Sequence, residues 1–499
     1  MIELSAAEIA AITGGELIGP AAGNPSLTVS SATTDSRDAG PGSLFIAKPG
    51  ETTDGHLFVP AAFESGAALA LVERPVADAS GTVLPAVQVP DAVLAMGRIA
   101  ADIVRRLRNE GELTVIGITG SAGKTTTKDL LAGILRRHGT TVAPIGSYNG
   151  EVGMPLTIFT APHGTRYLIL EMGATGIGHI RYLTELVRPD IGVVLCVGSA
   201  HAGEFGGVEN IAKAKGEMVE ALAEDGTAIL NADDQRVNAM APRTAAPILR
   251  FSSDPDLSAG NGSVRALELR TDDAGHPAFT LELPDGSRHQ VVSGLIGEHH
   301  TANLLAAAAA AWAAGIDGAS IAEALTGQGP ASRWRMERTD RPDGITVIND
   351  AYNANPESMR AALRTLAELG RERRTWAVLG EMLELGDASV LEHDALGRYI
   401  VRLNISKLIV VGDGARAMHT GAVMEGSWGD ESTFVRTAAE AEAILAEELA
   451  PGDIVLFKSS NGAGLRFLGD RIALKTPATP PSADTDATGS HPETGGHVL

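Results

Sequence analysis

The order of apolar and polar residues divides the chain into short apolar runs that alternate with longer amphipathic stretches. The runs at 113–118, 167–170, 191–197 and 228–230 are rich in Val, Ile and Leu, which predicts buried strands. Between them, apolar residues recur every three to four positions, which predicts helices. Because strands alternate with helices, we predict βαβ units and an α/β fold with a mostly parallel central sheet.

The chain of 499 residues is too long for one hydrophobic core, and we predict three units and a tail. Residues 1–108 form the first unit, residues 112–330 the central one and residues 331–473 the third. The third contains apolar runs that end near Asn349 and Phe457, and we expect Asn355 to cap a helix that begins at Pro356. Residues 474–499 are predicted to be a disordered tail, because they contain no aromatic residue and many Pro, Thr, Gly and Asp.

The most informative stretch is residues 113–129, in which an apolar strand runs into a glycine-containing turn and then a helix. Such a turn brings backbone N–H groups and a helix N-terminus to a phosphate group. Its residues are Thr119, Gly120, Ser121, Ala122, Gly123, Lys124, Thr125 and Thr126. The common pattern G-x-x-x-x-G-K-[ST] has glycine where this chain has Ile118, so the loop is a variant. An ordinary strand-to-helix turn that holds a lysine is the alternative.

Polar residues at predicted strand ends are further candidates, because ligands of parallel sheets bind beyond the carboxyl ends of the strands. Glu171 follows the run at 167–170, and a carboxylate at this position is suited to bind Mg²⁺. The alternative is a solvated acid at the end of a strand. His201 follows the run at 191–197. Lys215 lies in a charged helical stretch, and its spacing alone does not single it out.

Composition excludes several classes of function. The chain has 62 acidic and 40 basic residues and a net charge of −22, which argues against sequence-independent binding of nucleic acid. Its one cysteine, Cys196, permits no internal disulfide, and we predict a buried structural thiol. The longest apolar run, 304–314, is about half of what spans a bilayer, and residues 1–10 do not resemble a secretory signal. We therefore expect a soluble cytoplasmic protein.

Five of these motifs occur in an order that resembles the Mur ligase family, the ATP-dependent amide ligases of bacterial cell-wall precursor synthesis. They are the variant loop, Glu171, His201, the stretch 214–217 around Lys215, and the run 350–356. Within the family, the stretches 146–149, 171–174 and 352–356 resemble the branch that adds D-alanyl-D-alanine to a UDP-N-acetylmuramoyl-tripeptide. The resemblance implies a small N-terminal α/β domain for the UDP substrate, a central P-loop-type ATP domain and a C-terminal Rossmann-like ligase domain.

The resemblance also implies roles for individual residues. The catalytic set is Lys124, Lys215, His201 and Arg335. ATP is held by residues 119–126 together with Asn303, Arg335 and Asp350. Two Mg²⁺ ions are held by Thr125, Glu171, His201 and Lys215, the last as a carbamate. The UDP end of the substrate meets Asp35, Ser36, Arg37 and His56, while Ser147, Asn149, Asn353 and Asn355 meet the rest of the substrates.

Some expectations stay open at the level of sequence. Asp35, Ser36 and Arg37 also fit a plain polar turn, and the chain departs from the family pattern at Gly150 and His300. Other ligases of the superfamily, which add diaminopimelate or lysine, or add glutamate to folate, are the nearest alternatives. A nucleotide-dependent switch is less favoured because the guanine-reading pattern Asn-Lys-x-Asp is missing. We expect a monomer that uses small-molecule substrates.

Overall fold

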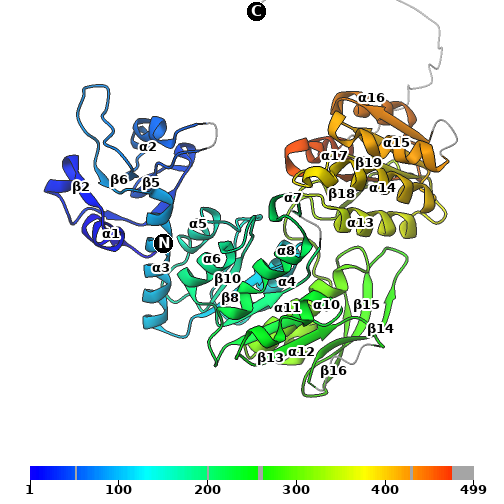
Figure 1. Ribbon diagram of the computed structural model, residues 1–499, viewed down its shortest axis with the longest axis horizontal. Helices are drawn as coiled ribbons and strands as arrows, with labels where there is room; N and C mark the ends of the chain where they lie inside the picture. Colours follow the sequence, from blue (N-terminus) through cyan, green and yellow to red (C-terminus); the bar gives the residue numbers. More distant parts are fainter. Residues whose placement is uncertain (51–52, 199–201, 257–261, 427–430, 475–499) are drawn as a thin grey trace, which may run out of the picture.

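The structure is a computed structural model that describes residues 1–50, 53–198, 202–256, 262–426 and 431–474. Three main sheets follow one another along the chain (Figure 1). The predicted α/β class with mostly parallel sheets is confirmed. None of the described helices has the length and apolar character needed to cross a membrane.

The N-terminal part is built on a five-stranded sheet, in which only β2 and β7 pair antiparallel. Its order is β2 (Glu16–Ile18), β7 (Ala86–Gln88), β6 (Leu69–Val72), β5 (Ser43–Ile46) and β4 (Ser31–Thr33), and β1 (Leu4–Ser5) pairs with β3 (Thr28–Val29) beside it. Helices α1 (Ala6–Thr13), α2 (Val59–Glu64) and α3 (Ala92–Glu110) accompany the strands. The 3₁₀ turns η2 (Ser36–Asp38) and η3 (Gly55–Phe58) carry the predicted substrate residues.

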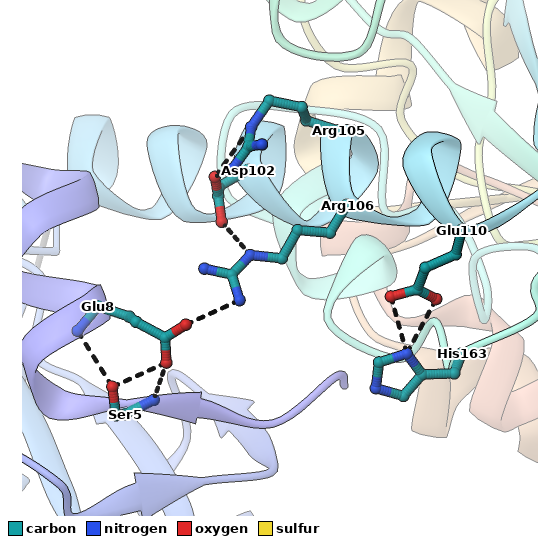
Figure 2. A network of polar contacts seen from close by, with 7 residues as sticks. All are labelled: Ser5, Glu8, Asp102, Arg105, Arg106, Glu110 and His163. Carbon is teal, nitrogen blue, oxygen red and sulfur yellow. Dashed lines mark hydrogen bonds and ion pairs between the residues drawn. The ribbon is translucent and has the colours of Figure 1, made fainter.

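Helix α3 joins the N-terminal part to the central one. It contacts α1 on one side and α5 (Gly153–Ile158) and α6 (His179–Val187) on the other, and its apolar face belongs to one continuous core that spans both parts. Figure 2 shows the polar contacts along it: Arg106 pairs with Glu8 of α1 at 2.9 Å, and Glu110 pairs with His163 of the central part at 2.9 Å. The N-terminal and central parts are therefore packed together along the whole of α3.

The central part is a nine-stranded sheet whose first seven strands are parallel, and its last two strands, β15 and β16, are added antiparallel. Its order is β9 (Thr141–Val142), β10 (Tyr167–Glu171), β8 (Thr114–Thr119), β11 (Ile191–Val194), β12 (Thr227–Asn231), β13 (Ile248–Ser252), β14 (Val264–Thr271), β15 (Pro277–Glu282) and β16 (Arg288–Val292). Strand β8 lies between β10 and β11, and its Gly117 pairs with Leu170 and Gly192. The phosphate-loop candidate therefore follows a strand in the middle of the parallel region.

Helices cover both faces of this sheet, which explains the continuous apolar runs of its strands. One face packs on α4 (Lys124–Leu135), α11 (His300–Ala313) and α12 (Gly318–Leu325). The other packs on α3, α5, α6, α8 (Val208–Lys215) and α9 (Glu217–Glu220). The short helices α7 (Ala202–Phe205) and α10 (Gln235–Asn238) complete this part.

The C-terminal part has a six-stranded sheet with one antiparallel edge strand. Its order is β17 (Glu337–Asp340), β18 (Thr346–Asn349), β22 (Ile454–Lys458), β19 (Thr375–Leu379), β20 (Lys407–Val411) and β21 (Ser432–Val435), and only β17 runs antiparallel. The accompanying helices are α13 (Pro356–Leu369), α14 (Ser389–Arg402), α15 (Arg416–Glu425), α16 (Ala438–Glu448) and α17 (Leu465–Leu474). The division of the chain at residues 108, 330 and 473 stays a prediction, and residues 475–499 of the predicted tail lie outside the described part.

Candidate active site

The loop between β8 and α4 has two positions that only glycine fills without a clash. Gly123 has φ = 83°, and a Cβ atom there would lie 2.2 Å from Oδ1 of Asn303. A Cβ atom at Gly120 would lie 2.8 Å from the Cβ of Leu195. The loop therefore sits tightly against α11 and the end of β11, and α4 begins directly after it with the N–H groups that favour phosphate.

Lys124 opens α4 and folds back over the loop. Its Nζ donates a hydrogen bond to the carbonyl oxygen of Gly120 at 2.7 Å. Burial lowers the pKa of this lysine, while the nearby carboxylate of Glu171 acts in the opposite direction. The result is a cation held at the place where the outer phosphates of a nucleotide would lie.

Glu171 is the last residue of β10 and is completely buried. Its Oε2 accepts a hydrogen bond from the hydroxyl of Thr125 at 3.4 Å, and its Oε1 has no hydrogen-bond partner among the residues that the structure describes. Burial raises the pKa of this carboxyl group, and Lys124 is the strongest of the charges that oppose the rise. A buried carboxylate with a free oxygen beside a threonine hydroxyl fits a divalent cation.

Lys215 ends α8 and is 4% exposed, whereas its neighbour Lys213 is exposed. Burial lowers the pKa of Lys215 to about 7, and the positive charge of Lys124 adds to this shift. His201, predicted as a metal ligand, lies outside the described residues. Within the described part of the chain, no three His, Cys, Asp or Glu side chains form a metal-binding group. A metal site here would therefore need other donors beside Glu171.

A cavity of about 480 Å³ lies between the central and C-terminal parts. The predicted residues that line it are Ser121, Ala122, Gly123, Lys124, Thr125, Thr126, Ser147, Asn149, Asn303, Arg335, Asp350, Asn353 and Asn355. The predicted residues Thr119, Gly120, Glu171, Lys215, Asp35, Ser36, Arg37 and His56 are not among its lining residues. The structure thus gathers most predicted nucleotide-site residues around one cavity.

Two side chains of the C-terminal part reach across to the loop. Nη2 of Arg335 donates a hydrogen bond to Oγ1 of Thr125 at 3.1 Å, and its guanidinium lies 4.5 Å from the ring centre of Tyr352. Nδ2 of Asn355 donates to the carbonyl oxygen of Ser121 at 3.3 Å. The cavity is therefore closed by direct contacts between its two walls.

Comparison with known proteins shows to which family the chain belongs. Residues 28–103 match the model described as Mur ligase family, catalytic domain, residues 118–311 match the Mur ligase middle domain, and residues 334–461 match the Mur ligase, glutamate ligase domain. A UDP-N-acetylmuramoyl-tripeptide–D-alanyl-D-alanine ligase of Mycobacterium tuberculosis is 45% identical over 507 aligned positions, which cover 95% of this chain and 98% of the relative. The chain belongs to the Mur ligase family.

Solved structures of other Mur ligases have the same architecture. A crystal structure of MurF from Acinetobacter baumannii superposes with a TM-score of 0.82 at 30% identity and covers 95% of this chain and 99% of its own. The MurF ligase of Thermotoga maritima in complex with ADP gives a TM-score of 0.73 at 25% identity, with 89% and 97% coverage. Both likenesses extend over all three parts of the fold.

In this Mur ligase, Asn303 of α11 packs against the phosphate-loop candidate. Its Oδ1 accepts a hydrogen bond from Thr127 at 3.3 Å, and its Nδ2 lies 3.2 Å from Nδ1 of His300. Burial lowers the pKa of His300 well below its ordinary value and that of His299 to about 4, so both rings are neutral at pH 7. The predicted adenine contact of Asn303 stays a prediction, because both ends of its amide already contact the chain.

The predicted residues of the N-terminal part lie on the short turns η2 and η3. The Asp35 carboxylate caps η2 through the N–H of Arg37 at 3.0 Å, and the hydrogen bond from the Arg37 guanidinium lowers the pKa of Asp35 to about 2. His56 is buried, with Nδ1 2.7 Å from Asp54 and Nε2 accepting the N–H of Glu73 at 2.9 Å. Asp35 and Arg37 thus form a polar turn, and their contact with substrate stays a prediction. A substrate contact by His56 would need a change of its partners.

Reasoning from the sequence missed Lys458, which ends β22 and lines the cavity. Its Nζ donates to Oδ2 of Asp350 at 2.5 Å and to the carbonyl oxygen of Asn353 at 3.0 Å. The signal was available, because Lys458 directly follows the apolar run at 454–457, as Glu171 follows the run at 167–170.

Cys196 differs from its prediction in one respect. The thiol is only partly buried and lines the cavity, although burial does raise its pKa. The N–H of Ala122 donates to its Sγ at 3.4 Å, so the side chain supports the phosphate-loop backbone. The predicted strand at 191–197 ends at Val194, and this leaves Cys196 in the loop that follows β11.

Proposed function

We propose that this Mur ligase joins D-alanyl-D-alanine to a UDP-N-acetylmuramoyl-tripeptide at the expense of ATP. The observation that carries the proposal is the 45% identity, over nearly the full length of both chains, to a relative named for this activity. The ADP complex of the Thermotoga maritima ligase supports ATP as the phosphoryl donor. The cavity, with Lys124 on one wall and Arg335 on the other, has the charge that phosphoryl transfer requires.

The proposed chemistry proceeds in two balanced steps. A carboxylate oxygen of the tripeptide attacks the γ-phosphorus of ATP, the bond to the β-phosphate oxygen breaks, and ADP leaves. The dipeptide amine then attacks the carbonyl carbon of the resulting acyl phosphate, and inorganic phosphate leaves as the amine loses a proton. Phosphorylation is needed because a free carboxylate is a poor electrophile.

The residues of this chain stabilise the negative charge of the reacting groups and exclude water from the site. Lys124 and the loop N–H groups hold the β- and γ-phosphates, and Arg335 stabilises the charge that spreads over the transferring group. Contacts between the two walls, such as the one from Asn355 to Ser121, keep water from the acyl phosphate.

We propose that the same site holds Mg²⁺, and two ions are expected. Thr125 and Glu171 would hold one, while Glu171, His201 and carbamoylated Lys215 would hold the second. The unpartnered Oε1 of Glu171 supports this assignment. Bound Mg²⁺ would neutralise phosphate charge and so reduce repulsion between the two anionic reactants.

A carbamate on Lys215 is chemically consistent with its surroundings. The lysine ammonium group first loses a proton. The neutral amine nitrogen then attacks the carbon of CO₂, a C–N bond forms as one C=O π bond breaks, and a second proton is released, which leaves an N-carboxylate. Only the unprotonated amine can react, and the burial of Lys215 favours that form. An ammonium group cannot ligate Mg²⁺, whereas an N-carboxylate can.

The remaining predicted contacts complete the proposal. Asp35, Ser36 and Arg37 would meet the UDP end of the substrate. Ser147 and Asn149, which line the cavity, would meet the rest of it, and Asn353 would meet the incoming dipeptide. ATP and UDP-linked precursors are cytoplasmic compounds, which supports a cytoplasmic location. We also propose that the enzyme acts as a monomer.

The test is release of ADP by the purified chain with defined substrates. We expect turnover only when the UDP-linked tripeptide and D-alanyl-D-alanine are both present, with L-alanyl-L-alanine as the matched control. Turnover triggered by diaminopimelate, lysine or glutamate would assign the chain to another branch of the family. Hydrolysis that ignores the dipeptide would contradict a ligase altogether.

A further inference from the structure

Arg335 lies in the segment that connects the central and C-terminal parts, residues 331–336, which we call the connecting strap. The two residues that flank Arg335 have left-handed backbone conformations, with φ = 59° at Trp334 and φ = 51° at Met336. Residues with a Cβ atom rarely adopt such angles, and they persist only where surrounding contacts hold them. The direction of Arg335 therefore depends on what fixes its neighbours.

Each flanking residue is held by a carboxylate. The backbone N–H of Trp334 donates to Oε2 of Glu337 at 2.9 Å, and its indole Nε1 donates to Asp470 at 3.0 Å. The backbone N–H of Met336 donates to Oδ1 of Asp350 at 3.1 Å. Asp350 is thus the group that holds the C-terminal side of the strap.

Asp350 is buried and carries a charge that needs compensation. Lys458 supplies it, because its Nζ donates to Oδ2 of Asp350 at 2.5 Å and to the backbone carbonyl oxygens of Asn353 at 3.0 Å and Asp350 at 3.4 Å. Lys458 is itself only 2% exposed. A buried carboxylate that loses the cationic partner beside it is left with an uncompensated charge, which favours movement toward water.

We infer that Lys458 is a positioning residue for Arg335. Its ammonium group holds the carboxylate of Asp350, Asp350 holds the N–H of Met336, and this fixes the backbone turn that directs Arg335 to Thr125. This inference rests on the proposed function, in which Arg335 acts on the transferring phosphoryl group. Lys458 itself is not proposed to contact the substrate.

Two variants separate positioning from simple stability. In Lys458→Met the buried Asp350 loses the ammonium group beside it and the strap loosens. We expect kcat to fall by up to about 100-fold, as for other small misplacements, with a smaller change in the KM for ATP. In the double variant Lys458→Met/Asp350→Asn, the amide oxygen still accepts the N–H of Met336, and the two charges of the buried pair are both removed. We expect its kcat to exceed that of the single variant by about tenfold, a recovery that a merely structural role of Lys458 does not predict.

Lys407→Met is the control, because Lys407 lies on the same sheet but outside the strap. An unchanged kcat in Lys458→Met, or a double variant no faster than the single one, would overturn the inference. A second measurement does not depend on turnover. The protein is labelled with 5-fluorotryptophan and its ¹⁹F NMR spectrum is recorded, and the signal of Trp334 is assigned as the one that is lost in Trp334→Phe. That signal should shift in Lys458→Met and return in the double variant, and no shift would overturn the inference even if the wild-type chain proved to have another activity.

Discussion

The guanidinium of Arg335 and the hydroxyl of Thr125 meet at 3.1 Å although 210 positions separate them along the chain. Arg335 belongs to the strap between two parts of the fold, and Thr125 belongs to the first turn of α4. Thr125 also donates to Glu171, so one hydroxyl connects the incoming arginine to the buried carboxylate.

Replacing Arg335 should affect the chemical step more than nucleotide binding. We expect Arg335→Ala to lower kcat by about 10³-fold, because a cation placed on the transferring phosphoryl group contributes about 10³ to 10⁵ in related chemistry. Steady-state kinetics with both substrates and calorimetry with ADP measure the two effects. Arg371→Ala, an exposed arginine that follows α13, should retain full activity. Equal losses in ADP affinity and kcat would show that Arg335 serves binding alone.

Glu171→Gln should separate metal binding from folding. The change keeps the shape of the side chain and removes a buried charge, so we expect the thermal stability of the nucleotide-free protein to be unchanged or higher. Activity should fall at least about 100-fold, and Mg²⁺ should no longer raise the melting temperature measured with ATP present. Glu185→Gln, on the exposed face of α6, is the control. A Mg²⁺ response equal to that of the wild type would remove Glu171 from the metal site.

Lys215→Ala should inactivate the enzyme, and added short carboxylic acids should restore part of the activity. If Lys215 acts as an N-carboxylate, then acetate or formate can occupy the space left by the side chain and supply the missing oxygen ligands. We expect activity near zero without added acid and partial recovery with it, measured as release of phosphate. Lys213→Ala removes an exposed lysine from the same helix and should behave as the wild type. Full activity of Lys215→Ala without acid would rule out the carbamate.

Gly123→Ala should damage the phosphate loop directly. Alanine at φ = 83° costs about 1–2 kcal/mol, and the added methyl group would collide with Asn303, as the distance of 2.2 Å shows. We expect weaker ADP binding by at least about tenfold, equivalent to about 1.4 kcal/mol, and a lower melting temperature. Gly111→Ala is the matched control, because a Cβ atom there meets no atom within 4 Å and its backbone is extended. An unaffected Gly123→Ala would mean that the loop rearranges at little cost.

The polar contacts of α1 should make the N-terminal part sensitive to acid. Hydrogen bonds from Ser5, followed by Arg106, lower the pKa of Glu8 from 4.5 to about 2 (Figure 2). Because the folded state favours the carboxylate, its stabilisation is present above pH 4.5 and is lost as the pH falls toward 2. Glu8→Ala should therefore cost about 0.5–1 kcal/mol at pH 7, and the difference should shrink below pH 4.5. Melting curves of the two proteins from pH 7 downward measure it, and a constant difference would contradict the assignment.

The sequence predicted the elements that are long, apolar and bounded by clear signals. Strands β8, β10, β11 and β12 of the central sheet, the glycine-containing loop and the Asn355 cap of α13 with its Pro356 were expected, and they are observed. Strands β9 and β13 of the same sheet were not predicted. Strands β17 and β21 were missed, since both lie at sheet edges and β17 consists of the polar residues 337–340 without an apolar run. Edge strands bury little surface, so their sequences carry little pattern.

The sequence by itself determined the class of the fold, the family and the position of the phosphate-loop candidate, because these depend on local pattern and on residue types in a fixed order. Tertiary structure decided the rest. The spacing around Lys215 resembles any charged helix, and only the packing of α8 buries it beside Lys124. The pairing of Asp350 with Lys458 joins residues 108 positions apart. Electrostatics depends on distance in space and on burial, and neither can be read from positions along a chain.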